Sequence, residues 1–227
     1  VVSTSYKYLI FSVLLIIIRF SVLTPLPEYN NAFNNSLLAL DSSVQQFWMS
    51  WRILLHYLQL SFWPNPLIWN YSLGHFEWGS NTIRLAIFSI TIYLGLIISA
   101  LLLLKKKSPI SFGIIFFLIT ILPVSNLIIK IASTFGERLL FIPSFGIILS
   151  AVFFIIFLFE RINNIKSFPI IILTSIAIVF TTMAAERTKA WKNNRTLILA
   201  DFKKTKSIRS VKSYIQFLTA DKNNVID

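Results

Sequence analysis

Long runs of apolar residues alternate with short polar segments along this chain of 227 residues. Five runs approach the length of about 20 residues that an α-helix needs to cross the hydrocarbon core of a bilayer. Charged residues are absent from all but the first run, which contains Arg19. The pattern predicts an all-α membrane protein with about five transmembrane helices. The predicted spans cover residues of about 8–26, 85–104, 112–129, 139–159 and 168–185.

A shorter amphipathic pattern lies between the first two runs, at residues 47–63. Arg52, His56 and Gln59 recur at the spacing of one helical face, and their neighbours are apolar or aromatic. Tryptophans crowd the region, as is typical of a membrane interface. We expect an interfacial or re-entrant helix whose polar stripe faces either water or a cavity. If this helix spans instead, the count becomes six and the chain's tail changes sides.

Basic residues in short loops indicate the orientation, because such loops stay cytoplasmic. Residues 105–107 are three lysines after the second run, and Arg161 and Lys166 lie between the fourth and fifth runs. The outer side then receives residues 28–82, the loop around 123–138 and the tail. The tail contains ten Lys and Arg residues, which would favour the cytoplasmic side and so oppose this orientation. Long segments, however, translocate largely regardless of charge.

The tail, residues 187–227, differs in character from the membrane domain, residues 1–186. Two groups of periodic apolar positions predict two short helices, the opening of a longer helical array. Because the chain begins with Val1 and two helices bury little apolar surface, we expect a processed or partial chain without a signal peptide. The apolar positions are Trp191, Leu197, Ile198 and Phe202, then Ile208, Val211, Ile215 and Leu218.

Composition strengthens the membrane assignment and narrows the chemistry. The chain is 56% hydrophobic and 13% charged, whereas soluble domains carry about 25% charged residues. The absence of cysteine excludes disulfides and thiol nucleophiles, and two histidines are too few for a metal site built from histidines. We find no paired carboxylates, glycine-rich phosphate loop or nucleophile elbow, so we identify no catalytic residue. The net charge of +12 accompanies no nucleic-acid motif.

Candidate binding residues cluster where the apolar runs meet the outer side. Glu137 and Arg138 come directly before the fourth run, and Arg187 and Trp191 follow the fifth. Arginine presents a planar fork that matches phosphate, and a neighbouring carboxylate holds such a fork in place. The alternative is that these side chains only anchor the helices at the interface.

Three stretches together resemble the transmembrane and tetratricopeptide-repeat O-mannosyltransferases and their bacterial relatives. They are residues 31–74, with NPLIWNYS, residues 121–146, with PVSN and GERLLFIPSFG, and residues 186–202, with ERTKAW. The resemblance implies a GT-C glycosyltransferase that takes a sugar, mannose in that family, from a polyprenyl-phosphate donor. The acceptor is a protein hydroxyl on the luminal or periplasmic face, reached through the repeats that follow.

The resemblance also implies site residues and a location. Glu137, Arg138, Arg187, Trp191 and the Tyr71 region carry over as donor-binding candidates, and we add Arg52 and His56 from the polar stripe. We favour a bacterial inner membrane, with the endoplasmic reticulum as the eukaryotic equivalent. Asn70 replaces the family's aspartate, Phe33 replaces its proline, and no stretch matches its catalytic acidic pair.

Two other functions fit the same pattern. One is a lipid-linked-oligosaccharide ligase or polymerase, which also has many spans and a large outer loop with arginines. The other is a non-catalytic membrane scaffold that presents repeats to a partner.

Overall fold

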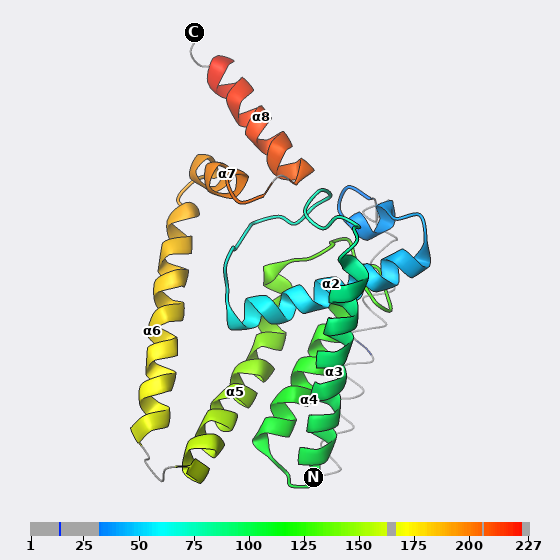
Figure 1. The fold of residues 1–227 in the computed structure, drawn as a ribbon. Coiled ribbons are helices and arrows are strands. Elements are labelled where there is room, and N and C mark those ends of the chain that lie inside the picture. The colour runs from blue at the N-terminus through cyan, green and yellow to red at the C-terminus, as the bar shows by residue number, and fades with distance from the viewer. Residues whose placement is uncertain (1–13, 15–31, 163–166, 206, 224–227) are drawn as a thin grey trace.

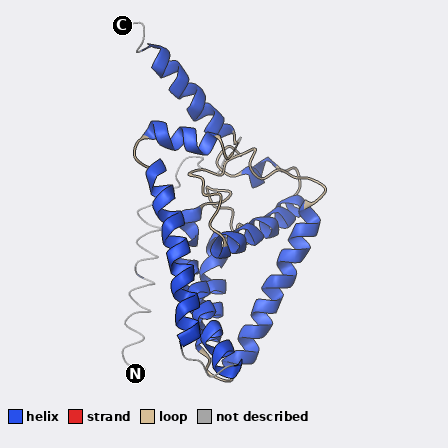
Figure 2. Ribbon diagram, turned by 60° about the vertical axis from the view of Figure 1, so that its left-hand side comes forward, coloured by secondary structure: helices blue, strands red, loops and turns tan. Residues whose placement is uncertain are grey.

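The computed structural model describes residue 14 and residues 32–162, 167–205 and 207–223. Helices make up its regular structure, and no strand occurs within these described ranges (Figure 2). The predicted first span, residues 8–26 with Arg19, lies outside them except for residue 14. An all-helical fold is therefore confirmed for the described part.

Within the described ranges, three helices are long and apolar enough to cross a membrane, judged by length and composition. They are α3 (Thr82–Leu104), α5 (Phe141–Ile162) and α6 (Ser167–Ala190). The apolar stretch that includes α5 runs over Glu137–Phe159, because it begins in the 3-10 turn that precedes this helix. They coincide with three of the predicted spans. Figure 1 shows these helices running lengthwise, with α7 and α8 at one end, called the outer end from here on, and the α3–α4 connection at the other.

The span predicted over residues 112–129 is helical only as far as residue 124, and residues 125–129 leave the helix. Helix α4 spans Pro109–Ile121 and continues only as the 3-10 turn η2, Leu122–Val124. Proline lacks the N–H that a continuing helix needs, and Asn126 adopts a left-handed conformation with φ of 58°. The Asn126 side chain then donates to the carbonyls of Ser133 and Thr134, which closes residues 126–134 into a compact loop.

Helix α2 (Ser43–Phe62) crosses the bundle rather than running along it (Figure 1). Ser42 caps its start by accepting the Val44 N–H, and Pro64 follows its end. Much of its surface is buried and forms the centre of the core, together with the outer parts of α3 and α4. Helix α2 forms over the segment where the amphipathic helix was expected, residues 47–63. The buried positions include Met49, Ile53, Leu54, Tyr57, Leu58 and Leu60.

Helices α4 and α5 pack through two glycines. A Cβ atom at Gly113 would lie 2.6 Å from the Gly146 carbonyl oxygen, and one at Gly146 would lie 2.5 Å from the Gly113 carbonyl oxygen. Side chains at either position would separate the two backbones. Small residues let helices approach closely in a bilayer, where packing rather than water exclusion drives association.

The tail forms two helices, as predicted: α7 (Asn194–Phe202) and α8 (Ile208–Asn223). Asn193 and Thr196 form a reciprocal capping box that starts α7. The Phe202 and Tyr214 rings stack at 4.1 Å and join the two helices. Helix α6 runs on to Ala190, so it continues without a break across the boundary placed between residues 186 and 187.

Candidate functional site

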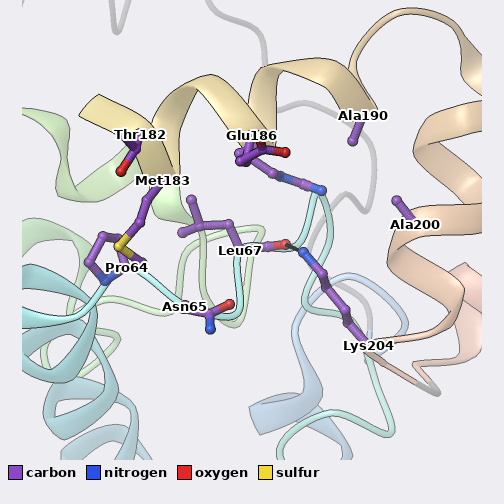
Figure 3. A pocket seen from close by; sticks show the side chains of 10 residues that line it. Pro64, Asn65, Leu67, Thr182, Met183, Glu186, Ala190, Ala200 and Lys204 are labelled. Atoms are coloured by element: carbon purple, nitrogen blue, oxygen red, sulfur yellow. Dashed lines mark hydrogen bonds between the residues drawn. The ribbon is translucent and has the colours of Figure 1, made fainter. Parts of the chain in front are cut away.

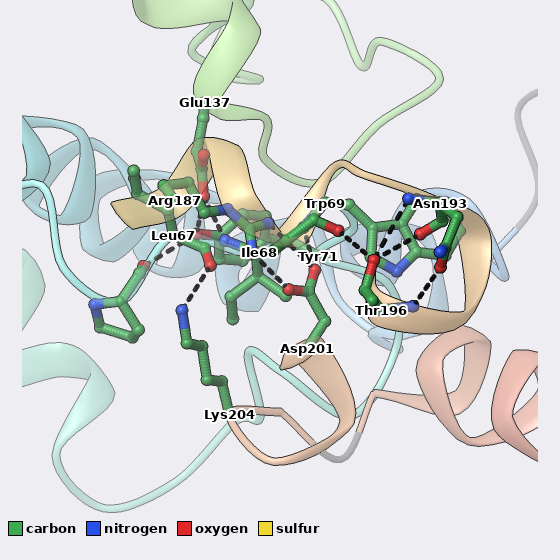
Figure 4. A network of polar contacts seen from close by, with 12 residues as sticks. Leu67, Ile68, Trp69, Tyr71, Glu137, Arg187, Asn193, Thr196, Asp201 and Lys204 are labelled. Carbon is green, nitrogen blue, oxygen red and sulfur yellow. Dashed lines mark hydrogen bonds and ion pairs between the residues drawn. The ribbon is translucent and has the colours of Figure 1, made fainter. Parts of the chain in front are cut away.

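The α2–α3 loop, residues 63–81, lies across the outer end of the bundle and is held by a carboxylate from η3 (Glu137–Leu140). One Glu137 carboxylate oxygen accepts the Ile68 N–H at 2.5 Å and the Tyr71 hydroxyl at 2.6 Å (Figure 4). Burial, followed by the Glu137 charge, raises the pKa of Tyr71, so its hydroxyl stays a donor at neutral pH. The structure thus brings together two predicted residues, Glu137 and Tyr71.

A second carboxylate, from α7, holds the next residue of the same loop. Asp201 is fully buried and accepts the Trp69 N–H at 2.5 Å. It also pairs with Arg187 of α6 through contacts of 2.7 and 3.3 Å. The side chain of Arg187 is only 10% exposed. Two carboxylates from distant parts of the chain therefore fix adjacent backbone N–H groups, as Figure 4 shows.

Further hydrogen bonds join the tail to this loop. The Ile208 N–H donates to the Leu73 carbonyl at 2.9 Å, and the Arg209 N–H donates to the Ser72 hydroxyl at 3.2 Å. Lys204 reaches the Leu67 carbonyl at 3.4 Å. The tail is therefore docked on the outer loop by several independent contacts.

A cavity of about 410 Å³ opens between the loop, the outer part of α6 and α7, and is called the junction pocket below (Figure 3). Its walls come from three segments far apart in sequence. Figure 3 shows α6 side chains on one side, loop residues facing them and tail residues closing the end. The lining residues are Pro64, Asn65, Leu67, Thr182, Met183, Glu186, Arg187, Ala190, Ala200 and Lys204.

The chemistry of the junction pocket changes with depth. Thr182, Met183 and Arg187 all belong to the candidate span α6, with Arg187 in its last turn, and Lys204 of the tail brings a second cation to the outer end. Glu186 is the one carboxylate in the lining, and it pairs with Lys189 at 2.5 Å, both side chains being largely exposed. Two cations above apolar walls suit a lipid phosphate, since arginine and lysine both bind phosphate oxygens.

Of the polar stripe of α2, Arg52 and His56 are half-buried and Gln59 is exposed, and none of the three lines the junction pocket. Arg52 donates to the Glu77 carbonyl at 2.5 Å and to the Thr82 hydroxyl at 3.2 Å. His56 contacts Gln59 at 3.2 Å, and its Nε2 atom is buried without a hydrogen-bond partner in the described part of the chain. Arg52 and His56 thus hold the loop from below.

Two histidines meet within an aromatic cluster under the loop. The rings of His56 and His75 lie 6.3 Å apart, surrounded by Tyr71, Phe76 and Phe135. Burial lowers the pKa of His75 to about 4, with the charges of His56 and Arg52 acting in the same direction. Burial also lowers the pKa of His56. Both rings are therefore neutral at pH 7.

The remaining predicted residues lie outside the network. Arg138 is exposed, and Glu137 binds the loop rather than the Arg138 guanidinium. Trp191 is 59% exposed, with the Arg187 guanidinium 5.8 Å from its ring centroid.

Asp201 and Lys204 are the site residues that the sequence reasoning missed. One signal was present: Asp201 is the only acidic residue between Glu186 and Asp221, within a strongly basic tail. A lone carboxylate on an otherwise apolar and basic helix is expected to have a partner. Within the described ranges, no group of three His, Cys, Asp or Glu side chains is placed to hold a metal ion.

Comparisons of this chain with protein families, curated proteins and solved structures found no match.

Proposed function

We propose that this chain belongs to the membrane domain of a GT-C-type glycosyltransferase and binds the phosphate of a polyprenyl-phosphate-linked sugar at the outer face. The sugar, mannose by resemblance, is passed to a protein hydroxyl. The observation that carries the proposal is the junction pocket. It joins apolar walls from a candidate span to the cations Arg187 and Lys204, as a lipid phosphate requires.

The three motif stretches of the resemblance support the proposal by where they lie. NPLIWNYS forms the loop, GERLL carries Glu137, and ERTKAW ends α6, so all three contribute to one junction. In this proposal α4 and residues 8–26 complete a bundle of five spans. The helices α7 and α8 form the first repeat unit, which presents the protein acceptor.

The contribution proposed for this chain is donor binding rather than proton transfer. Transfer to a hydroxyl needs a carboxylate that removes a proton, and fixed cations that stabilise the leaving phosphate. Glu137 and Asp201 are both engaged with loop N–H groups. Lys204 and the exposed Arg138 at the same outer end supply the second requirement, and Arg187, which is paired with Asp201, lies beside them.

A binding experiment on the whole chain in lipid nanodiscs tests the proposal. Lys204→Ala removes a pocket cation, and Lys203→Ala removes its exposed neighbour, which does not line the pocket. We expect Lys204→Ala to weaken binding of a polyprenyl phosphate about tenfold, as loss of a charge-assisted contact predicts. Lys203→Ala should stay within about twofold of the parent chain.

Two results contradict the proposal. Polyprenyl phosphate that fails to bind the parent chain removes the function outright. Equal weakening by both substitutions shows general attraction to a basic surface instead of a site. Competition with an anionic phospholipid separates donor recognition from ordinary headgroup binding, because a selective site keeps its preference under excess phospholipid.

A second function, a non-catalytic scaffold, is favoured by one specific observation. The tail is docked on the loop through Asp201, Ile208 and Arg209, so its helices are presented in a fixed orientation. A chain that binds no polyprenyl phosphate but retains this docked tail fits the scaffold.

A further inference from the structure

A second, larger cavity of about 740 Å³ runs inside the bundle between α2, α3, α4 and α5, and is called the bundle groove below. Its lining is almost entirely hydrocarbon, with Ser99, Ser150 and Gln59 as the only polar side chains. Ser150 already donates to the Ile110 carbonyl, which leaves the groove with little hydrogen-bonding capacity. Such a surface favours an apolar occupant.

The length of the bundle groove indicates what kind of chain it accepts. Along α3 its lining extends from Phe88 to Leu103, a rise of about 22 Å at 1.5 Å per residue. One leaflet of a bilayer accounts for about half of a 30 Å hydrocarbon core. The groove thus continues past the midplane, where the acyl chains of an ordinary phospholipid end. A longer chain matches it better.

The groove and the junction pocket flank the same helix end. Gln59 and Phe62, in the last turn of α2, line the groove, whereas Pro64 and Asn65 line the pocket. Only Trp63 separates the two sets in sequence, and it is 57% exposed. The two cavities thus flank the same end of α2, with the cations on the side of the junction pocket and hydrocarbon on the side of the groove. A lipid with one phosphate head and one long chain matches a cationic pocket that is followed by an apolar groove.

We propose that the bundle groove seats the hydrocarbon chain of a single-chain isoprenoid lipid whose phosphate lies in the junction pocket. This inference rests on the proposed function, because it takes the donor class from it and adds where the chain lies. The end of α2 lies between the phosphate head of the lipid and its hydrocarbon chain. Dispersion contacts with the Leu, Ile and Phe side chains of four helices hold the chain against exchange with bulk lipid.

Photo-crosslinking of the whole chain in nanodiscs tests the groove. The probe is a long-chain polyprenyl phosphate with a diazirine near the end of its chain, and the adducts are mapped by mass spectrometry. We expect adducts on groove residues such as Leu96, Leu103 and Ile114. Ser99→Trp fills the groove from α3, and Ile98→Trp places the same ring on the neighbouring exposed position outside it.

The expected result is a loss of groove adducts of at least about fivefold with Ser99→Trp, and less than about twofold with Ile98→Trp. Adducts restricted to exposed positions outside the lining, with phosphate binding intact, overturn the groove and leave the proposed function standing. Loss of all probe binding in the parent chain overturns both. Excess phosphatidylglycerol that removes the groove adducts also overturns the inference, because a diacyl lipid then occupies the groove.

Discussion

The buried pair of Arg187 and Asp201 makes a sharp prediction about the docking of the tail. Arg187→Met keeps most of the apolar length of the side chain and removes its charge. Asp201, which is fully buried, then retains the Trp69 N–H but loses its cation. We expect the tail to open from the loop far more often, because a buried charge without its partner is costly.

The magnitude follows from the burial of the two groups. Removing one member of a buried ion pair typically costs about 3–5 kcal/mol. The lower end applies here, since Arg187 is 10% exposed and Asp201 keeps one hydrogen bond. A cost of about 3 kcal/mol corresponds to roughly a hundredfold larger population of the open state. Because the contacts form one interface, that increase should appear at amides that the substitution leaves in place.

Native-state hydrogen exchange measures this opening directly. The reporter is the Ile208 N–H, which donates to the Leu73 carbonyl and touches neither member of the pair. Its exchange should accelerate about a hundredfold in Arg187→Met. The matched control is Arg195→Met, which removes an exposed cation on α7 that packs on a ring and forms no ion pair with any described residue.

A double-mutant cycle separates the pair from general damage. Asp201→Asn keeps an oxygen for the Trp69 N–H and removes the negative charge. The double variant buries no net charge, so it should open less often than the two single effects predict when added together. A coupling free energy below about 0.5 kcal/mol would refute the pair as the origin of the docking. So would a reporter that exchanges equally fast in Arg187→Met and Arg195→Met.

Two further predictions concern the bundle and the loop. Gly146→Ala places a Cβ atom 2.5 Å from a facing carbonyl oxygen. Thermal unfolding in detergent should therefore show that the free energy of unfolding falls by about 1–3 kcal/mol. The control Gly95→Ala, with nothing within 4 Å of the added Cβ atom, should be neutral or stabilising by up to about 1 kcal/mol. Equal effects of the two substitutions would contradict the close α4–α5 contact. His75 has a pKa of about 4 in the folded chain against an ordinary 6.5, so the unfolded state binds more protons between those two pH values. Stability therefore falls as the pH drops from 6.5 to 4. The loss is at most about 3 kcal/mol, and it is smaller because the ring is partly exposed. Melting temperatures at pH 7 and pH 5 should therefore differ less in His75→Phe than in the parent chain, and an unchanged difference would exclude this histidine as the cause.

The length of the apolar runs predicts the long helices well, because a segment of about 20 apolar residues has few alternatives to a helix in a bilayer. The spans at residues 85–104, 139–159 and 168–185 appear as α3, α5 and α6. The same reasoning fails at residues 125–129. There hydropathy stays high, but Pro123 and the left-handed Asn126 end the helix and begin a loop. Hydropathy averages cannot register such local backbone constraints.

The candidate site was predictable only in part. Glu137, Tyr71 and Arg187 were named from motifs, yet nothing in their spacing indicates that Glu137 binds the Ile68 N–H instead of supporting Arg138. Asp201 was missed because its partners, Arg187 and Trp69, are separated from it by 14 and 132 residues. Long-range polar contacts depend on how helices are placed, which a single sequence does not reveal.

The geometry of the outer face follows from how its backbone donors are satisfied. The α2–α3 loop has no sheet or helix partner, so its N–H groups need acceptors from elsewhere. Two are supplied by Glu137 and Asp201, from helices on either side of the loop. Because Asp201 belongs to the tail, the junction pocket keeps its shape only while the tail is docked. Release of α7 therefore removes Lys204 and the support of Arg187 together, so donor binding and tail docking should be lost in parallel.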